Sequence, residues 1–242
     1  MVKSYSKKFY DNKTKKTLES AKQIIPLILR LINPKSVVDI GCARGEFLSV
    51  FRERGINNIL GVEGKWVDKK KLLIPEKDFL SFNLEKSLDT KKKFDLALSL
   101  EVAEHLKKSS AKQFVKTLVN LSDIILFSAA IPYQGGTNHI NEQWQTYWVN
   151  LFKEKDYLPI DCLRKDMWDN KKISFWYAQN MILFVKKEVL YKDKKLKKEY
   201  EENKNNSLSI IHPKLYLFIA SKYNQIKKMI PLPIRKILRK IN

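Results

Sequence analysis

Cysteine is scarce in this 242-residue sequence, where only Cys42 and Cys162 occur. Two isolated cysteines exclude a disulfide framework and a cysteine zinc site, and they are typical of a reducing compartment. The sequence also lacks a run of about 18 uncharged apolar residues, which a membrane-spanning helix would need. The first eight residues contain no apolar segment of the kind found in signal peptides. We therefore expect a cytoplasmic protein.

Two common nucleotide-binding motifs are absent as well. The sequence has neither the Gly-x-Gly-x-x-Gly of a dinucleotide site nor a phosphate loop ending in Gly-Lys-Ser/Thr. The sequence instead contains the glycine-rich stretch Val37–Phe47. It begins with apolar, β-branched residues and contains the pattern Asp-x-Gly-x-x-x-Gly, which starts at Asp39. Gly41 and Gly45 allow a sharp turn and a close approach to a ligand. The missing lysine argues against a nucleoside triphosphate.

Positive charge is abundant, with a net charge of +21, but it is unevenly distributed. Lys and Arg outnumber Asp and Glu by 9 to 2 in residues 1–35 and by 16 to 5 in residues 186–242. Residues 36–185 are almost neutral, with 22 basic and 19 acidic side chains. The excess of positive charge at the two ends has two possible explanations, an anionic partner or a solvated, lysine-rich surface without a specific partner.

Strand and helix patterns alternate along the chain. Apolar residues at helical spacing predict a helix over Thr17–Ile32, which Asn33-Pro34 ends. Further helices are predicted at 46–54 and 109–121, and strands at 37–40, 57–62, 77–82, 94–99, 124–127 and 179–186. This alternation favours an α/β fold with right-handed crossovers, a mostly parallel sheet and a ligand at the carboxyl ends of the strands.

Four ordered motifs then carry a family resemblance. Val37–Phe47, Gly61–Gly64, Phe82–Leu84 and Phe94–Leu106 resemble those of class I S-adenosylmethionine (SAM) dependent methyltransferases in order and spacing. The resemblance covers roughly residues 20–186. It implies a Rossmann-like sheet of seven strands, mostly parallel with an antiparallel last hairpin, flanked by helices.

The resemblance also implies a set of SAM-binding residues. Glu63, about twenty residues past the glycine turn, would accept hydrogen bonds from both ribose hydroxyls. Asn83 would contact the adenine amino group, and the backbone beside it would present an N–H to the ring. The full set implied for the cofactor is Asp39, Gly41, Cys42, Gly45, Glu63, Asn83, Leu84 and Glu101.

Glu101, Glu104 and His105 stand at positions i, i+3 and i+4, and would share one face if the segment turned helically. The run resembles that of metal-dependent members such as the small-RNA terminal 2′-O-methyltransferases, and also that of ubiquinone-biosynthesis O-methyltransferases. In the metal-dependent members two Glu and two His hold Mg²⁺ or a related ion over a vicinal diol. The ligands of Mg²⁺ or Mn²⁺ here would be Glu101, Glu104, His105 and His139.

Two other interpretations of this cluster remain open. His139 alone can act as a general base. Alternatively the Glu-His pair is structural, with His105 bonded to backbone and Glu101 lining the cofactor pocket. In the catalytic interpretation, His139, Glu101 and His105 position and activate the acceptor.

Aromatic residues crowd the segment Asn141–Tyr177, and Trp144, Tyr147 and Trp148 are spaced to share one helix face. Such a stripe is commonly core, but with polar neighbours such as Asn138, Arg164 and Glu142 it would also suit a sugar pocket. The runs 138–144 and 176–180 resemble methyltransferases associated with polysaccharide and other surface-glycan synthesis.

We therefore predict an N-terminal basic tip and covering helix (1–35), a SAM-dependent methyltransferase domain (36–186) and a basic helical extension (187–242). The predicted function is O-methylation of a sugar hydroxyl in a glycan or its nucleotide- or lipid-linked precursor. The alternatives are an RNA ribose 2′-O-methyltransferase and a non-catalytic SAM-fold binding protein. The basic, apolar tail from Ile210 onward would bind an anionic membrane surface, RNA or a second subunit. The sequence identifies neither the sugar nor the oligomeric state.

Overall fold

The computed structural model describes residues 7–229, and in this range seven strands form one sheet. The strands are β1 (Ser36–Ile40), β2 (Asn58–Glu63), β3 (Phe79–Ser81), β4 (Leu96–Leu100), β5 (Ile124–Ser128), β6 (Tyr157–Ile160) and β7 (Ile182–Lys186). Their order in the sheet is β3-β2-β1-β4-β5-β7-β6. The first five strands are parallel, while β7 is antiparallel to both β5 and β6. The predicted fold class is confirmed.

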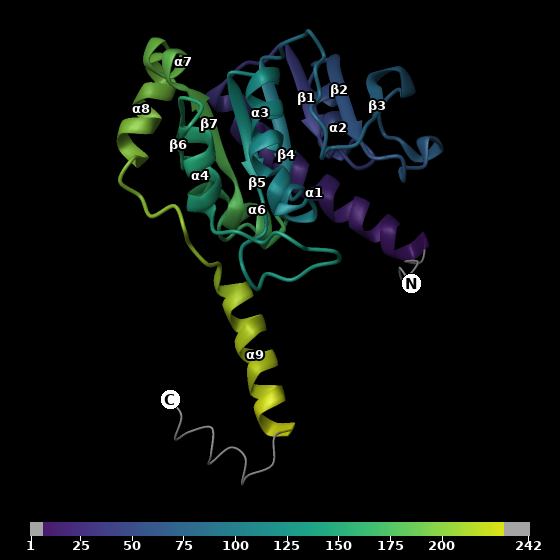
Figure 1. Ribbon diagram of the computed structural model, residues 1–242, viewed down its shortest axis with the longest axis vertical. Coiled ribbons are helices and arrows are strands. Elements are labelled where there is room, and N and C mark those ends of the chain that lie inside the picture. Colours follow the sequence, from purple (N-terminus) through teal and green to yellow (C-terminus); the bar gives the residue numbers. More distant parts are fainter. Residues whose placement is uncertain (1–6, 230–242) are drawn as a thin grey trace. The chain divides into compact units, whose positions relative to one another are not determined.

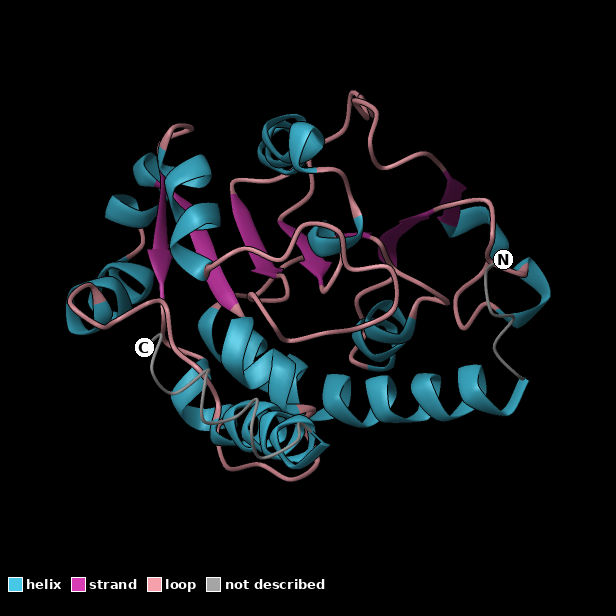
Figure 2. Ribbon diagram, turned by 60° about the horizontal axis from the view of Figure 1, so that its bottom comes forward, coloured by secondary structure: helices cyan, strands magenta, loops and turns pink. Residues whose placement is uncertain are grey.

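Helices cover both faces of the sheet (Figures 1 and 2). They are α1 (Lys7–Leu31), α2 (Glu46–Glu53), α3 (Ala111–Leu121), α4 (Gln145–Lys153), α5 (Arg164–Met167), α6 (Phe175–Asn180), α7 (Lys187–Lys192) and α8 (Lys194–Asn203), while a further helix, α9 (Pro213–Met229), belongs to a second compact unit of the chain. Apart from α9, their buried residues fall into two clusters. One lies under α1, α2 and α5 to α8, and the other lies under α3 and α4.

Successive residues of a strand belong alternately to these two clusters, because their side chains point to opposite faces of the sheet. In β4, Leu96 and Leu98 join the first cluster and Ala97 joins the second. A strand buried on both faces reads as a continuous apolar run. This is why the central strands were predictable from the sequence.

Helix α1 is longer than predicted, because it begins at Lys7 rather than at Thr17. Pro26 lies inside it, where proline removes one backbone hydrogen bond. Ile24, Ile25 and Ile28 flank Pro26 and are fully or almost fully buried. Their packing on the sheet holds the helix on both sides of the proline.

Three other elements differ from the prediction. β3 is shorter than the predicted strand 77–82, because Glu76–Asp78 forms a 3₁₀ turn before it. The last strand begins at Ile182 rather than Gln179, because α6 runs through Asn180. β6 has no counterpart among the predicted strands. It is a four-residue edge strand containing Pro159, and a proline is tolerated at a sheet edge because it cannot donate to a ladder.

By compactness the chain divides after Ile210 into residues 1–210 and 211–242. Leu190 of α7 and Leu196 of α8 are buried in the first core cluster, so these helices belong to the larger unit. The functional division at residues 35 and 186 stays a prediction. No helix within residues 7–229 is long and apolar enough to cross a membrane.

Candidate active site

The turn after β1 depends on glycine. Gly41 and Gly45 have φ angles of +88° and +86°, in the left-handed region that favours glycine. A Cβ on Gly41 would lie 2.2 Å from a methyl carbon of Val102, which follows β4. The Gly41 N–H donates to the carbonyl of Val62 at 2.8 Å, which ties the turn to the end of β2.

Three carboxylates surround this turn. Glu63, at the end of β2, accepts hydrogen bonds from the backbone N–H of Ala43 at 3.1 Å and of Gly64 at 2.8 Å. Glu46, the first residue of α2, accepts from the backbone N–H of Arg44 and from the Thr14 hydroxyl of α1. Asp39 precedes the turn and is 4% exposed. The three acids come from three elements and meet at one place.

Their proximity and burial oppose ionisation. Burial first, and then the charges of Glu63 and Glu46, raise the pKa of Asp39 well above its ordinary value. Burial also raises the pKa of Glu46, although its hydrogen bonds act in the opposite direction. A cationic ligand on the turn would stabilise all three carboxylates in their charged form.

The other residues predicted to bind the cofactor lie around the same sheet edge. The Asn83 side chain is exposed, and its oxygen accepts a hydrogen bond from the Glu85 N–H at 3.0 Å, while Leu84 is buried. The Cys42 thiol faces the core, since a Cβ on Gly61 would lie 2.8 Å from its sulfur. Burial raises the pKa of this thiol. Cys42 can therefore contribute only its backbone to a ligand on the turn.

The structure brings together three of the four predicted metal ligands. One ligand atom each of Glu104, His105 and His139 lies within 4.8 Å of the others. The two imidazole rings are 4.8 Å apart in an edge-to-face arrangement. Glu104 is almost fully buried, and the His139 side chain is about one-eighth exposed. These three side chains offer one oxygen and two nitrogen ligand atoms near the carboxyl end of β4.

Glu101 is not part of this group. Its carboxylate accepts hydrogen bonds from the Asn180 amide at 3.1 and 3.3 Å and from the Gln134 amide at 2.9 Å. The helical face predicted for residues 101–105 is wrong. Glu101 has a φ of +57°, and a 3₁₀ turn begins only at Ala103. Glu101 therefore lies outside the helical turn that contains Glu104, and the two carboxylates have different partners.

Sequence reasoning missed the amides that hold Glu101. Gln179 and Asn180 at the end of α6 are at most 2% exposed. The Gln179 amide donates to the side-chain oxygens of Gln134 and Asn180, so the three amides form a connected network around Glu101. The adjacent amide pair just before an apolar strand was the available signal, because buried amides need partners.

Glu142 organises the loop that carries His139. Its carboxylate accepts hydrogen bonds from the backbone N–H groups of Tyr133 and Gly135, both at 2.8 Å. The same carboxylate lies 2.9 Å from Nδ1 of His139, which leaves Nε2 for a ligand. A Cβ on Gly136 would lie 2.1 Å from that Nε2, so a larger residue at position 136 would displace the His139 ring. The role of Glu142 was not predicted.

The aromatic segment divides between core and surface. Trp148 is 2% exposed and its ring packs against Phe127, whereas Trp144 precedes α4 and is 41% exposed. The prediction that both share one presented face is therefore wrong. Tyr133 and Ile140, on the loop that carries His139, are also exposed.

Arg164 does not lie in a sugar pocket. It is 2% exposed and forms a salt bridge with Asp161. It also donates to the backbone carbonyls of Gln179 and Leu208. These contacts hold the chain after α8, at Leu208, against α5 and the end of α6.

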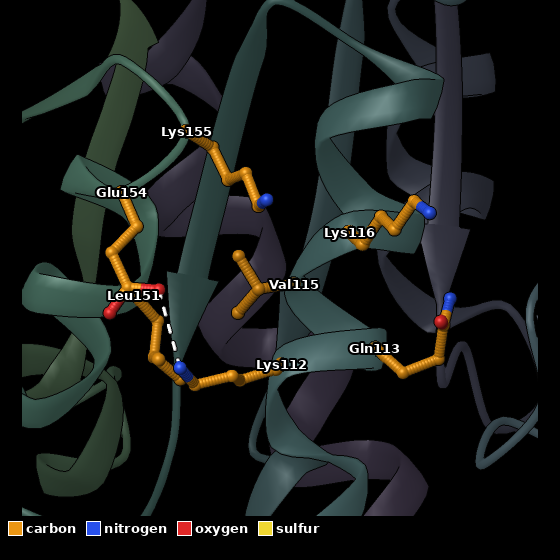
Figure 3. A pocket seen from close by; sticks show the side chains of 7 residues that line it. All are labelled: Lys112, Gln113, Val115, Lys116, Leu151, Glu154 and Lys155. Atoms are coloured by element: carbon orange, nitrogen blue, oxygen red, sulfur yellow. Dashed lines mark ion pairs between the residues drawn. The ribbon is translucent and has the colours of Figure 1, made fainter.

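A hollow of about 160 Å³ lies elsewhere, on the outer surface of α3 and α4 (Figure 3). Lysine side chains from both segments border it, and Lys112 pairs with Glu154 at 3.6 Å. It contains none of the predicted site residues. The candidate site is instead the open edge where the glycine turn, Glu63 and the Glu104 group meet.

A methyltransferase domain family matches residues 14–150, more than half of the chain. The chain belongs to this family. The match contains the glycine turn, Glu63, and the Glu104, His105 and His139 group. No curated protein matches the sequence significantly.

Solved methyltransferases share the fold. The methyltransferase domain of bacterial CtHen1-C is 21% identical, with a TM-score of 0.52, over 70% of this chain and 98% of that one. The plantazolicin methyltransferase BpumL, in complex with SAH, is 12% identical with a TM-score of 0.51, over 74% and 88% of the two chains. Magnesium protoporphyrin IX methyltransferase from Synechocystis PCC 6803, with bound SAH, is 15% identical with a TM-score of 0.50, over 71% and 83%.

The protein is thus a SAM-dependent methyltransferase, and its glycine turn suits that cofactor. SAM carries a cationic sulfonium and a ribose with two hydroxyls. The carboxylates of Asp39, Glu46 and Glu63 would supply negative charge to a sulfonium bound there, and a carboxylate that already accepts two N–H groups still has lone pairs for hydroxyls.

The methyltransferase should lose stability when Gly41 is replaced by alanine. We expect Gly41→Ala to lower the free energy of unfolding by about 2–4 kcal/mol, from left-handed strain and overlap with Val102. Gly55→Ala is the matched control, because Gly55 has a φ of +89° but nothing within 4 Å of its missing Cβ. That control should cost only about 1–2 kcal/mol in urea unfolding. Equal losses in the two variants would show that contact with Val102 does not matter.

The raised pKa of Asp39 predicts a pH dependence of stability. Its carboxyl has a higher pKa in the folded state, so its stabilising contribution is full below the unfolded pKa of about 3.9 and is lost as the pH rises through the folded value. At neutral pH without SAM, Asp39→Asn should therefore be more stable than the wild type, while binding SAM more weakly. Urea unfolding between pH 4 and 8 tests this, and parallel curves for the two proteins would contradict it.

Proposed function

We propose that this methyltransferase transfers the methyl group of SAM to a sugar hydroxyl of a glycan or of its nucleotide- or lipid-linked precursor. We further propose that Glu104, His105 and His139 hold a divalent cation, Mg²⁺ or Mn²⁺, that assists the transfer. The convergence of these three side chains, within 4.8 Å of one another beside the glycine turn, supports the proposal.

The chemistry of the acceptor explains why such a group is useful. SAM already has a good leaving group, but an aliphatic hydroxyl is a weak nucleophile at neutral pH. A bound cation lowers the pKa of a coordinated oxygen and orients it. Mixed carboxylate and imidazole donors suit Mg²⁺, Mn²⁺ or another first-row ion better than a metal that prefers thiolates. His139 would be placed to accept the hydroxyl proton if it acted without the ion.

The surface beside this group supports a ring-shaped acceptor. Tyr133 is 81% exposed and Ile140 is 62% exposed, and both belong to the loop that carries His139. The N–H of Ile140 donates to the backbone carbonyl of Glu104, so this loop lies directly against the site. Tyr133 holds a φ of +67°, a strained angle for an aromatic residue, and Glu142 fixes its N–H there. An exposed aromatic ring such as that of Tyr133 can pack against the C–H face of a sugar, and the Ile140 side chain adds apolar surface beside it.

Charge favours a glycan over RNA. Proteins that bind RNA backbones usually place Lys and Arg along the site, whereas residues 36–185 carry 22 basic and 19 acidic side chains. A ribose 2′-hydroxyl would nevertheless satisfy the same donor group. RNA therefore remains the alternative that an experiment must test.

The decisive test is transfer of radiolabelled methyl from SAM to a panel of glycans, sugar nucleotides, glycolipids and RNAs, with and without a chelator. Label on a sugar-containing acceptor that a chelator suppresses and Mg²⁺ or Mn²⁺ restores would support both proposals. Label on RNA alone would overturn the glycan assignment. Transfer that is insensitive to the chelator would overturn the assignment of the ion.

The proposal also predicts a role for Glu142. Glu142→Gln should lower kcat about tenfold or more, because a neutral amide orients the His139 ring less strongly than a carboxylate. Added Mn²⁺ should partly restore the rate, and the Kd of SAM should not change. Glu154→Gln, on the outer surface of α4, is the matched control. An unchanged kcat and metal requirement in Glu142→Gln would contradict this role.

A further inference from the structure

Helix α9, Pro213–Met229, exposes an unusual amount of apolar surface. Its exposed apolar side chains are Tyr216, Leu217, Phe218, Tyr223, Ile226 and Met229, at 49–82% of their full exposure. A run of large apolar side chains in water marks a site of interaction. The question is which partner suits this helix.

Five of these six exposed apolar residues lie along one side of the helix, and Leu217 is the exception. Tyr216 and Tyr223 are spaced i, i+7, Phe218 and Ile226 are spaced i, i+8, and Ile226 and Met229 are spaced i, i+3. These spacings place the five residues along one side of a helix. Ser221 and Asn224 occupy positions on the other side, together with Leu217. Helix α9 is therefore amphipathic.

The charge of α9 has one sign only. The segment contains four lysines, Lys214, Lys222, Lys227 and Lys228, and neither aspartate nor glutamate. Lys222 lies 4.3 Å from the centre of the Phe218 ring, and Lys227 lies 5.9 Å from that of Tyr223. Lysines are thus interleaved with the exposed aromatic rings and can reach beyond them. Aromatic rings at an interface, with lysines extending to charged groups, are typical of helices that lie on lipid headgroups.

We infer that α9 binds the surface of an anionic bilayer, with its apolar side in the headgroup region and its lysines on the lipid phosphates and carboxylates. The combination of features favours lipid over the other partners. Nucleic acid would use the lysines but would leave the apolar side in water. A second copy of the helix would bury the apolar side but would bring lysines of like charge together. This inference does not depend on the acceptor or on the cation.

Sedimentation of the full-length protein with lipid vesicles tests the inference. We expect binding to phosphatidylcholine vesicles that contain phosphatidylserine, weak binding to phosphatidylcholine alone, and a loss of binding as salt is raised. The triple variant Tyr216→Ser, Phe218→Ser, Tyr223→Ser should bind the anionic vesicles at least about tenfold more weakly. Lys222→Gln and Lys227→Gln should each weaken binding about fivefold.

Matched controls separate a specific helix from general basicity. Tyr191→Ser removes an exposed aromatic ring from α7, and Lys194→Gln with Lys197→Gln removes two charges from α8. These variants should keep most of the binding, and all variants should retain SAM binding as evidence of folding. Binding that survives the triple serine substitution would overturn the inference. Binding to RNA in place of vesicles would overturn it in favour of nucleic acid, and self-association that the serine variant abolishes, without vesicle binding, would assign α9 to a second copy.

Discussion

Glu63→Ala should weaken SAM binding by about a hundredfold to ten-thousandfold while leaving the protein folded. A hydrogen bond to a charged group contributes about 1.5–3 kcal/mol, and we expect Glu63 to accept one from each ribose hydroxyl. Loss of both corresponds to about 3–6 kcal/mol, and each 1.4 kcal/mol is a factor of ten in Kd. The variant also removes the acceptor of the Ala43 and Gly64 N–H groups, which loosens the turn under the cofactor. Isothermal titration calorimetry with SAM and SAH measures the effect.

Two further variants make this measurement specific. Glu53→Ala removes an exposed acid at the end of α2 and should leave the Kd unchanged. Glu63→Gln keeps an oxygen for one N–H but lacks the charge and the second acceptor, so its Kd should fall between those of Glu63→Ala and the wild type. If Glu63→Ala binds SAM as tightly as Glu53→Ala does, the ribose does not lie at the end of β2.

His139→Ala should lower kcat by about a hundredfold to ten-thousandfold, with little change in the Kd of SAM. This range is typical for the loss of a group that moves or activates the acceptor proton. His139 reaches the site from the loop after β5, and its ring stands 4.8 Å from that of His105. Its ring is held by Glu142 and not by the carboxylates around the glycine turn, so cofactor binding should not depend on it. Single-turnover methyl transfer separates the chemical step from binding.

Combining the variant with a chelator distinguishes the two proposed roles of His139. If it acts as a ligand of the cation, chelation should cost the wild type about as much as the substitution does, and it should cost His139→Ala little more, because effects within one unit are not additive. If His139 acts only as a base, the fold loss of kcat caused by chelation and that caused by His139→Ala should multiply. Thr137→Ala, in the same loop, serves as the control and should retain the wild-type kcat. A fully active His139→Ala would remove this residue from the mechanism altogether.

The parts of the site that could be predicted from the sequence are those set by local geometry. Gly41 and Gly45 were identifiable because a tight turn at a strand end needs positive φ angles. Glu63 was placed at the end of β2 because one strand and one helix span a nearly fixed number of residues between the turn and the next strand end. The central strands were recognisable because burial on both faces requires continuous apolar runs.

Other features depended on residues far apart in the sequence. Glu101 and Glu104 have the same residue type and lie close in the chain, yet one is held by Asn180 and the other joins His139. Spacing alone suggested one shared face, because it carried no sign of the left-handed angle at Glu101. Likewise, no local pattern indicated that the Glu142 carboxylate would contact Tyr133, Gly135 and His139.

The sequence by itself determined the sheet, the glycine turn and the acid beside it, because these follow from periodicity and from backbone angles within a few residues. Only the tertiary structure decided which side chains meet across the loops after β4 and β5, and which aromatic rings are core. Trp144 and Trp148 illustrate the difference, since they lie four residues apart but one is 41% exposed and the other 2%. Whether a side chain is buried depends on which distant segments pack against it. The residues next to it in the sequence do not determine that packing.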